Sequence, residues 1–278
     1  MTPSSHRLLE TIAPLLEEVS RVDILPRFHG ITGNAVSEKT SAFDVVSEAD
    51  EAAEKFISDR LRASFPAATI IGEELVAKSP AALDLLSEAD LAFVIDPIDG
   101  TKNFTSGLPL FGTMIAVVAK GEVVFGAIHD PIGNSTAFAA RGEGAWADSV
   151  YCGRRQLQVS GGKPVQAMQG AISTNFLPAS LKPVVLRNLP KLDLTFWTRC
   201  CAHEYRLAAA GHCDLLLYSK VMPWDHCAGW LLHREAGGFG AHFDGSPYRP
   251  SDKSGGLIYA PDEDSWWSAR TALFEEAA

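Results

Sequence analysis

Acidic side chains at the end of one apolar run could bind a divalent cation. Asp96 and Asp99 lie three residues apart in the sequence DPIDGT, directly after the run Leu91–Ile95. Because Pro97 has no backbone N–H and cannot continue a central strand, we expect the strand to stop with Asp96 at its end and Asp99 one turn further on. Ile98, with its side chain in the core, would offer only its carbonyl oxygen. Oxygen ligands of this kind suit Mg²⁺, so the segment predicts a magnesium site.

Two further carboxylates extend this set. Glu73 follows an apolar run that ends in Gly72, which places it at a strand end, and Asp225 precedes a predicted helix that ends near Gly237. The charge of −4 on these four residues would be balanced by two divalent cations. Metal ions about 3.5–4 Å apart can polarise a phosphoryl group, generate hydroxide from a bound water and stabilise the leaving alkoxide. The set therefore predicts hydrolysis without a covalent intermediate.

An anion site is expected beside the metal ions. Gly100 allows close approach of the backbone to a ligand, and the N–H groups of Gly100 and Thr101 would form an anion pocket if they open a helix. His226 is next to Asp225, but a histidine at the start of a helix is expected to be packed or hydrogen-bonded.

A rival chemistry uses an aspartyl nucleophile in an Asp-x-Asp-x-Thr motif, as in the haloacid-dehalogenase phosphatases. Asp96 and Asp99 are three residues apart rather than two, and they do not lie near the start of the chain. We therefore favour hydrolysis by a metal-activated water.

The elements that must position these residues follow from apolar spacing. A helix is predicted to begin near Leu8 and to end at Pro26 and Gly30, and a second one to run from about Glu48 to Ser64. The predicted apolar stripe of the second helix is Ala52, Phe56 and Leu61. Short apolar runs then predict a sheet, with a hairpin around Gly121. The predicted strands are Ala68–Ile71, Leu91–Ile95, Thr113–Lys120, Glu122–His129 and Ser135–Arg141.

The later half of the chain alternates helices and strands, which predicts an α/β arrangement after a more strand-rich α+β beginning. A polar, glycine-containing stretch over residues 148–164 is the expected boundary, dividing the chain into subdomains 1–147 and 148–278 with the site between them. The later elements are predicted at about Gln169–Thr174 (strand), His203–Ala210 (helix), Asp214–Tyr218 (strand), His226–Ala236 (helix) and Gly256–Ala260 (strand).

Composition excludes several classes of function. The 278 residues include 24 basic and 34 acidic ones, and 24 − 34 gives a net charge of −10 without any Lys/Arg cluster, so nucleic acid is not expected as a partner. Five cysteines without a C-x-x-C pair argue against a disulfide framework and a zinc site. The N-terminal residues hold no apolar stretch of signal or membrane length. No membrane contact is therefore expected, and the cytoplasm is the expected location.

The motifs together resemble those of the inositol monophosphatase family. The sequences GEE at 72–74, DPIDGT at 96–101 and WD followed by AG at 224–229 occur in the family's order. The likeness continues through residues 39–50, 142–145 and 158–160, so it covers most of residues 35–260. The resemblance implies a layered αβαβα sandwich of the inositol monophosphatase and fructose-1,6-bisphosphatase type, usually a homodimer, with two or three Mg²⁺ ions in each active site and inhibition by lithium.

The resemblance also assigns roles by position. Glu73, Asp96 and the Ile98 carbonyl would hold the first Mg²⁺, and Asp96, Asp99 and Asp225 the second. The implied catalytic residues are Glu73, Thr101, which helps to activate the attacking water, and Asp50, which hydrogen-bonds Thr101. The implied phosphate and substrate site comprises Asp99, Gly100, Thr101 and Asp225. Lys39 would lie in a mobile loop over the metal ions.

One departure leaves the substrate open. Inositol-specific members carry a glutamate seven residues before the aspartate of the Trp-Asp motif, and this position is Tyr218 here. Lys102 after Thr101 also occurs in the histidinol-phosphatase and nucleotide-phosphatase branches. The expected substrate is therefore a small phosphate monoester of an inositol or another polyol or sugar. Histidinol phosphate (an amino-alcohol phosphate), a 3′(2′),5′-bisphosphate nucleotide and fructose 1,6-bisphosphate are alternatives.

An alternative of another class is a regulatory protein with residual phosphatase activity. Some members of the family that this chain resembles act through protein and RNA partners. The complete set Glu73, Asp96, Asp99 and Asp225 favours catalysis.

Overall fold

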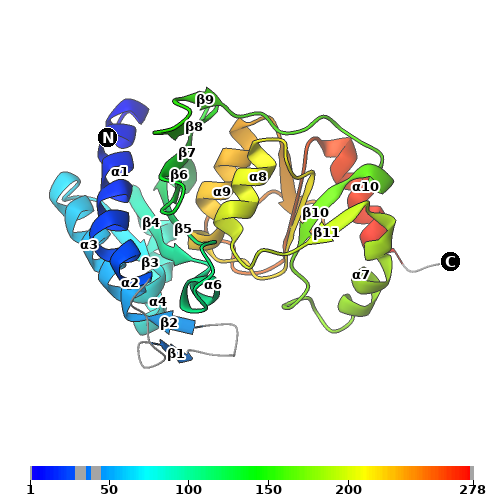
Figure 1. The fold of residues 1–278 in the computed structure, drawn as a ribbon, viewed down its shortest axis with the longest axis horizontal. Helices are drawn as coiled ribbons and strands as arrows, with labels where there is room; N and C mark the ends of the chain where they lie inside the picture. The colour runs from blue at the N-terminus through cyan, green and yellow to red at the C-terminus, as the bar shows by residue number, and fades with distance from the viewer. Residues whose placement is uncertain (1, 29–35, 39–44, 276–278) are drawn as a thin grey trace.

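Layers of helices and strands alternate across the molecule in the order αβαβα, which confirms the sandwich that the resemblance implies (Figure 1). The computed structural model describes residues 2–28, 36–38 and 45–275. The outer layer at the N-terminal end holds α1 (Ser5–Val19), α2 (Leu25–Phe28) and α3 (Glu48–Ser64). The short strands β1 (Val36–Glu38) and β2 (Val45–Ser47) pair with each other in antiparallel fashion.

The first helical segment continues through Pro26, the first of its two predicted stops. A π-helical segment, Ser20–Ile24, joins α1 to α2, so helical backbone reaches Phe28 although Pro26 was expected to stop it. Pro26 is the second residue of α2, which directly follows the π-helical segment, where the regular hydrogen-bond ladder of the α-helix is already interrupted. Gly30, the other predicted stop, lies outside the described residues.

The bounds of α3 are those predicted from the sequence, but its buried face is rotated from the predicted stripe. Ala52 and Phe56 are only half-buried. The apolar residues that α3 buries are Ala49, Ala53, Ile57 and Leu61. Their four-residue spacing forms a continuous ridge, which packs on the sheet beside β4 (Leu91–Asp99).

The seven-stranded sheet follows chain order from β3 to β9, and all neighbours are antiparallel except the parallel pair β3 and β4. The predicted hairpin is confirmed: Lys120 and Gly121 join β5 to β6 with φ of 52° and 78°, as a type I′ turn requires. Besides β4, the strands of the seven-stranded sheet are β3 (Thr69–Gly72), β5 (Gly112–Ala119), β6 (Glu122–Asp130), β7 (Ser135–Ala140), β8 (Ala145–Ser149) and β9 (Arg155–Gln156). Short helices around it are α4 (Glu73–Lys78), a 3₁₀ turn at Pro80–Asp84, α5 (Leu85–Glu88) and α6 (Thr101–Thr105).

The five-stranded sheet has the order β11-β10-β12-β14-β13 and is mixed. Its strands are β10 (Gln169–Ile172), β11 (Leu194–Phe196), β12 (Leu215–Tyr218), β13 (Phe239–His242) and β14 (Leu257–Ala260). The accompanying helices are α7 (Lys182–Asn188), α8 (Cys201–Ala209), α9 (Pro223–Glu235) and α10 (Glu263–Phe274), with 3₁₀ turns at Val165–Ala167 and Leu189–Lys191. Strands β8, β9, β11 and β13 and helices α7 and α10 were not among the predicted elements.

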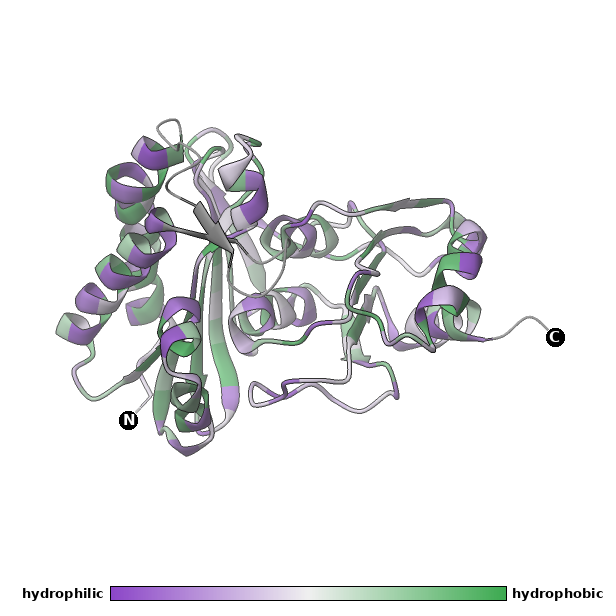
Figure 2. Ribbon diagram, turned by 90° about the horizontal axis from the view of Figure 1, so that it is seen from below, coloured by the Kyte–Doolittle hydropathy of each residue, from purple (hydrophilic) through white to green (hydrophobic). Residues whose placement is uncertain are grey.

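Helices α8 and α9 form the middle layer, and α7 and α10 cover the outer face of the second sheet (Figure 1). Three clusters of buried apolar residues fill the interfaces: one under α1 and α3, one around α8 and α9, and one under α7 and α10. Hydrophobic residues accordingly concentrate in the strands and on the inward faces of the helices (Figure 2). Burial of these apolar surfaces is the main force that holds the layers together.

The contact between α8 and α9 depends on a glycine. A Cβ placed on Gly229 would lie 2.0 Å from the ring of Tyr205, which is itself in edge contact with Tyr259. We expect Gly229→Ala to lower the free energy of unfolding by about 1–3 kcal/mol, because the packed ring has no room to retreat. Chemical denaturation would measure this loss. Gly161→Ala, whose Cβ would meet nothing within 4 Å, is the control, and equal stability of the two variants would contradict the prediction.

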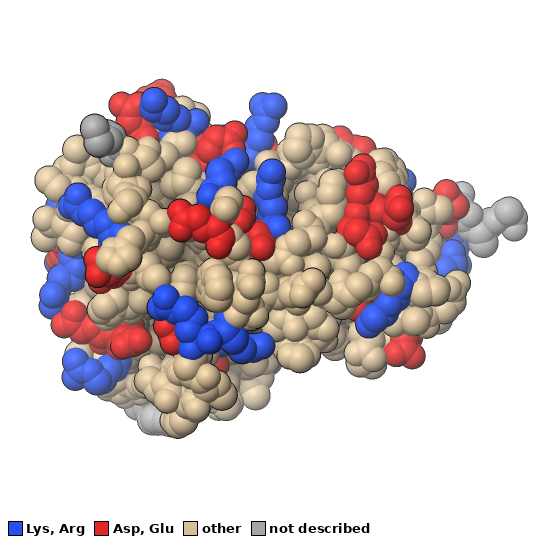
Figure 3. Space-filling model, turned by 90° about the horizontal axis from the view of Figure 1, so that it is seen from above, with Lys and Arg blue, Asp and Glu red and all other residues tan. Residues whose placement is uncertain are grey.

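On the face shown in Figure 3, Lys and Arg side chains are interspersed with Asp and Glu side chains, and neither sign covers a continuous area. None of the described helices combines the length and apolar character that crossing a membrane requires.

Candidate active site

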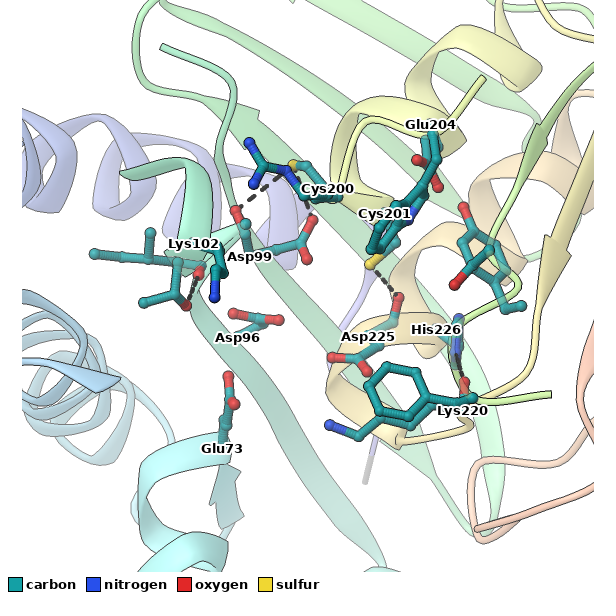
Figure 4. A pocket seen from close by; sticks show the side chains of 18 of the residues that line it. Glu73, Asp96, Asp99, Lys102, Cys200, Cys201, Glu204, Lys220, Asp225 and His226 are labelled. Carbon is teal, nitrogen blue, oxygen red and sulfur yellow. Dashed lines mark hydrogen bonds between the residues drawn. The ribbon is translucent and has the colours of Figure 1, made fainter. Parts of the chain in front are cut away.

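A cavity of about 570 Å³ lies beside β4, with walls from both halves of the chain. Glu73 enters it from the start of α4, Asp96 and Asp99 from β4, and Asp225 from the first turn of α9. Figure 4 shows these four carboxylates facing a common space. Residues far apart in the sequence are thus brought together at one site.

The other predicted site residues are placed as follows. Ile98, Gly100, Thr101, Lys102 and Tyr218 line the same cavity. Asp50 does not line it but is buried beside it, close enough for its charge to act on Asp96. Lys39 lies outside the described residues.

The strand β4 does not stop at Asp96 as the sequence analysis expected. Asp96 pairs with Met114 and Asp99 with Gly112, so two residues of β4 face one residue of β5 across an irregularity in the ladder. Such a bulge needs no ladder N–H from Pro97, whose carbonyl instead accepts a bond from the Thr113 hydroxyl at 2.9 Å. The bulge turns the chain so that both aspartates reach the cavity.

The turn after Asp99 depends on a left-handed residue. Gly100 has φ of 85°, and a Cβ there would lie 3.1 Å from the Leu110 carbonyl oxygen. The hydroxyl of Thr101, the first residue of α6, donates to the Ile98 carbonyl at 3.0 Å. The hydrogen bond predicted between Thr101 and Asp50 stays a prediction.

The carboxylates oppose one another's ionisation. Burial and then the charges of Glu73, Asp99 and Asp225 hold the pKa of Asp96 well above its usual value. Its Oδ1 atom is buried without a hydrogen-bond partner among the described residues. Burial raises the pKa of Asp99 to about 6 against the bonds donated by Cys200 and Ala202. A buried carboxylate oxygen with no donor is the group that a hard cation would satisfy.

The carboxylates are not drawn together into a closed ligand set. Within residues 2–28, 36–38 and 45–275, no three His, Cys, Asp or Glu side chains form a group that could already hold a metal ion. Bound cations would reduce the mutual repulsion of the carboxylates and so allow the side chains to approach.

Glu73 is positioned by a second glutamate that the sequence analysis did not single out. The Glu54 carboxylate of α3 accepts bonds from the N–H groups of Glu74 and Leu75, at 2.7 and 2.8 Å, and so caps the start of α4. A Cβ on Gly72 would lie 2.2 Å from this carboxylate. Gly72 thus leaves the space in which Glu54 holds the backbone of Glu73.

The beginning of α8 was also missed, because the sequence placed the start of this helix at His203. Asp99 Oδ2 accepts bonds from the Ala202 N–H at 2.6 Å and the Cys200 thiol at 3.0 Å. The thiol of Cys201 donates to the Asp225 carbonyl at 3.1 Å. The start of α8 thereby holds the Asp99 carboxylate and the backbone of Asp225. Cysteine at a helix start gives no sequence signal for such a role.

His226 is a structural residue of the cavity wall. Its Nδ1 is 2.8 Å from the Tyr205 hydroxyl and its Nε2 is 2.9 Å from the Lys220 carbonyl oxygen. Burial lowers the pKa of His226, so the neutral ring is favoured. Both ring nitrogens are engaged, as the expectation of a packed or hydrogen-bonded histidine requires.

Comparison with known proteins gives this geometry a family. The model of the inositol monophosphatase family matches residues 16–277. The chain belongs to that family. A fructose-1,6-bisphosphatase/inositol-1-monophosphatase of Thermotoga maritima is 32% identical, with 81% of this chain and 83% of the relative covered. A Nus factor SuhB of Haemophilus influenzae is 34% identical, with 78% of each chain covered.

Solved structures agree with the inositol monophosphatase fold. The extragenic suppressor protein suhB of Bartonella henselae has a TM-score of 0.83 at 26% identity, over 98% of this chain and all of that one. An IMPase of Thermotoga maritima has a TM-score of 0.80 at 25% identity, over 96% of this chain and 98% of that one. Membership of the inositol monophosphatase family supports a metal-dependent phosphatase activity for this chain.

For an inositol monophosphatase-family site with these carboxylates, we expect Mg²⁺ to raise the unfolding temperature more at pH 7.5 than at pH 5. The folded pKa of Asp99, about 6, is above its ordinary value of 3.8. Stability of the metal-free protein therefore falls as pH rises from about 4 to 6, and the penalty persists above pH 6. Protons also compete with the cation for the carboxylates below that range.

Thermal unfolding with and without Mg²⁺ at the two pH values measures the difference. In Asp99→Asn the dependence on pH should shrink. An equal Mg²⁺ effect at pH 5 and pH 7.5 in the unaltered protein would contradict the prediction.

Proposed function

We propose that this chain is a Mg²⁺-dependent phosphomonoesterase that hydrolyses a small phosphate ester with an activated water. The observation that carries the proposal is the convergence of Glu73, Asp96, Asp99 and Asp225 on one cavity, with Asp96 Oδ1 buried and without a donor. Oxygen-only ligation of this kind suits Mg²⁺.

We propose the two groups of metal ligands that the family resemblance implies. Glu73, Asp96 and the Ile98 carbonyl would hold one ion, and Asp96, Asp99 and Asp225 would hold a second. The family resemblance implies two or three ions in each active site. When bound, Mg²⁺ would polarise the phosphoryl oxygen, lower the pKa of the attacking water and stabilise the leaving oxygen.

The chain's own groups would orient the ester and move the proton. The Gly100 and Thr101 N–H groups, at the start of α6, would hold phosphate oxygens. The Thr101 hydroxyl donates to the Ile98 carbonyl, so its lone pairs would be available to accept a hydrogen bond from the attacking water and help to activate it. Glu73 would orient the same water, and buried Asp50 would add negative charge that favours proton acceptance.

Phosphate release tests the proposal. Inositol 1-phosphate, histidinol phosphate, fructose 1,6-bisphosphate and a nucleoside 3′,5′-bisphosphate would be compared with Mg²⁺ and with EDTA. We expect release that needs Mg²⁺ and that lithium inhibits, from a homodimeric enzyme as in the family. Release that survives EDTA, or a covalent adduct trapped on Asp96 with a phosphate mimic, would overturn the mechanism.

A regulatory role is the second candidate, favoured by relatives that carry the name Nus factor SuhB. It predicts a protein or RNA partner that co-purifies with the chain and binds equally to an Asp96→Asn variant. Absence of Mg²⁺-dependent release from every ester, together with such a partner, would favour this role over catalysis.

A further inference from the structure

The cavity is lined by cationic side chains that metal binding does not use. Three cations line it, from separate segments: Lys102 in α6, Arg199 just before α8, and Lys220 between β12 and α9. Figure 4 shows Lys102 beside Asp99 and Lys220 across the cavity near Asp225. In a chain of net charge −10, such a gathering at one site requires an explanation.

Lys102 and Arg199 lie on adjoining backbone. The side-chain amide of Asn103 donates to the carbonyls of Leu110 and Thr198, both at 2.8 Å, and is buried. The bond to Thr198 joins Asn103, the residue after Lys102, to the residue before Arg199. The two cations therefore come from segments that are fixed against each other.

Arg199 has an unusual backbone conformation. Its φ is 58°, in the left-handed region that non-glycine residues rarely adopt. Both flanking residues are anchored: the Thr198 N–H and hydroxyl donate to Glu204, and the Cys200 thiol donates to Asp99. A glycine would relieve the strain, so the side chain of Arg199 is the feature that the fold retains at a cost.

The Arg199 side chain has no structural partner in the part of the chain that the structure describes. It is half-buried and lines the cavity, yet it makes no hydrogen bond or ion pair with any residue that the structure describes. The described network thus gives the guanidinium no role in stability. A planar fork of donors held at a phosphatase site matches the oxygens of a phosphate.

Two aromatic side chains at the same cavity are exposed. Phe176 and Trp197 line it with 47% and 38% of their surface accessible, whereas the large aromatic residues of the three cores are buried. The Lys220 ammonium lies 6.0 Å from the centre of the Phe176 ring. Exposed rings next to cations are the arrangement on which nucleobases stack.

We infer that the substrate is a nucleotide with two phosphates. One phosphate would be hydrolysed at the carboxylate side, the other would bind Arg199 and Lys102, and the base would stack on Phe176 or Trp197. The inference rests on the proposed phosphatase function and specifies its substrate class. Arg199 is then a specificity-determining residue that binds substrate away from the reacting atoms.

Four esters separate the contributions of the second phosphate and the base. Adenosine 3′,5′-bisphosphate has both, fructose 1,6-bisphosphate has only a second phosphate, adenosine 2′-monophosphate has only the base, and glycerol 2-phosphate has neither. We expect kcat/KM to be highest for the first. A wild-type enzyme that prefers fructose 1,6-bisphosphate would overturn the role of the aromatic residues.

The decisive variant is Arg199→Gly, which removes the side chain and relaxes the backbone. For adenosine 3′,5′-bisphosphate we expect kcat/KM to fall by roughly 10- to 100-fold, mainly through KM, as for loss of a charge-assisted hydrogen bond. For glycerol 2-phosphate the change should stay within about twofold, and the unfolding temperature should not fall. Equal losses on both esters would overturn the phosphate subsite.

Lys120→Gly is the matched control, since Lys120 is also a cation at positive φ, 52°, in the exposed β5–β6 turn. It should leave all four esters unaffected. Calorimetric binding of adenosine 3′,5′-bisphosphate in Ca²⁺ provides a readout that needs no turnover. Binding that Arg199→Gly weakens would support the subsite even if the proposed hydrolysis failed, and binding unchanged by the variant would refute the subsite even if hydrolysis occurred.

Discussion

Asp96→Asn lowers kcat/KM for Mg²⁺-dependent phosphate release by at least about a thousandfold in our expectation, with no loss of stability in the metal-free protein. Asp96 is the one side chain proposed for both metal ions, so its loss weakens every interaction that develops on the phosphoryl group. The amide keeps the shape of the carboxylate but removes its charge. Because burial and four neighbouring carboxylates raise the pKa of Asp96, removing this charge should leave the unfolding temperature unchanged or raise it.

Phosphate-release kinetics and thermal unfolding of the metal-free protein measure the two effects. Asp90→Asn is the control, because Asp90 is exposed and precedes β4 at the end opposite Asp96. The control should match the unaltered protein in both assays. Near-normal turnover by Asp96→Asn would show that Asp96 is not a metal ligand.

Glu54→Ala should cost roughly 3 kcal/mol of unfolding free energy, because it leaves the N–H groups of Glu74 and Leu75 without their acceptor. It should also reduce phosphate release at least about tenfold, since Glu73 would no longer be held at the cavity. Denaturant unfolding and kinetics at saturating Mg²⁺ measure these losses. Glu54 does not line the cavity, so the effect on rate would be one of positioning.

Two variants of α3 test this explanation. Glu54→Gln keeps one acceptor oxygen and should recover part of both losses. Glu51→Ala removes an exposed partner of Lys78, an ion pair with an N–O distance of 3.1 Å that should be worth less than about 1 kcal/mol. If Glu54→Ala lost stability but kept a normal apparent affinity for Mg²⁺, Glu54 would be a structural residue only.

The sequence predicted most elements of the first half because its apolar runs are short and end at Gly or Pro. The hairpin at Lys120 and Gly121 and the bounds of α3 followed from such local signals. The end of β4 did not, because a bulge is set by the partner strand: β5 places Gly112 opposite Asp99, and Pro97 is tolerated in between. Likewise, Pro26 was expected from its residue type alone to stop the helix, whereas at its position in α2 the helical backbone continues to Phe28.

The acidic members of the candidate site could be predicted, and the residues that hold them could not. Glu73 and Asp99 follow apolar strands, which is a local pattern. Their supports come from distant segments: Glu54 is 20 residues from Glu74, and the Ala202 N–H that binds Asp99 is 103 residues away. No periodicity within one segment encodes such a contact. Arg199 belongs to none of the recognised sequence motifs, and its positive φ is visible only in the structure.

The bonds from the start of α8 to Asp99 have a consequence for dividing the protein. A chain cut at Gly161 would leave Glu73, Asp96 and Asp99 on one fragment and Asp225, with the Cys200 and Ala202 donors, on the other. Neither piece alone would carry a complete acidic set, and the hydrogen bonds that cross between them are part of the site itself. Phosphate release from the mixed fragments would then report their reassembly, so the chain is suited to serve as a split reporter in which turnover signals the meeting of two fused partners.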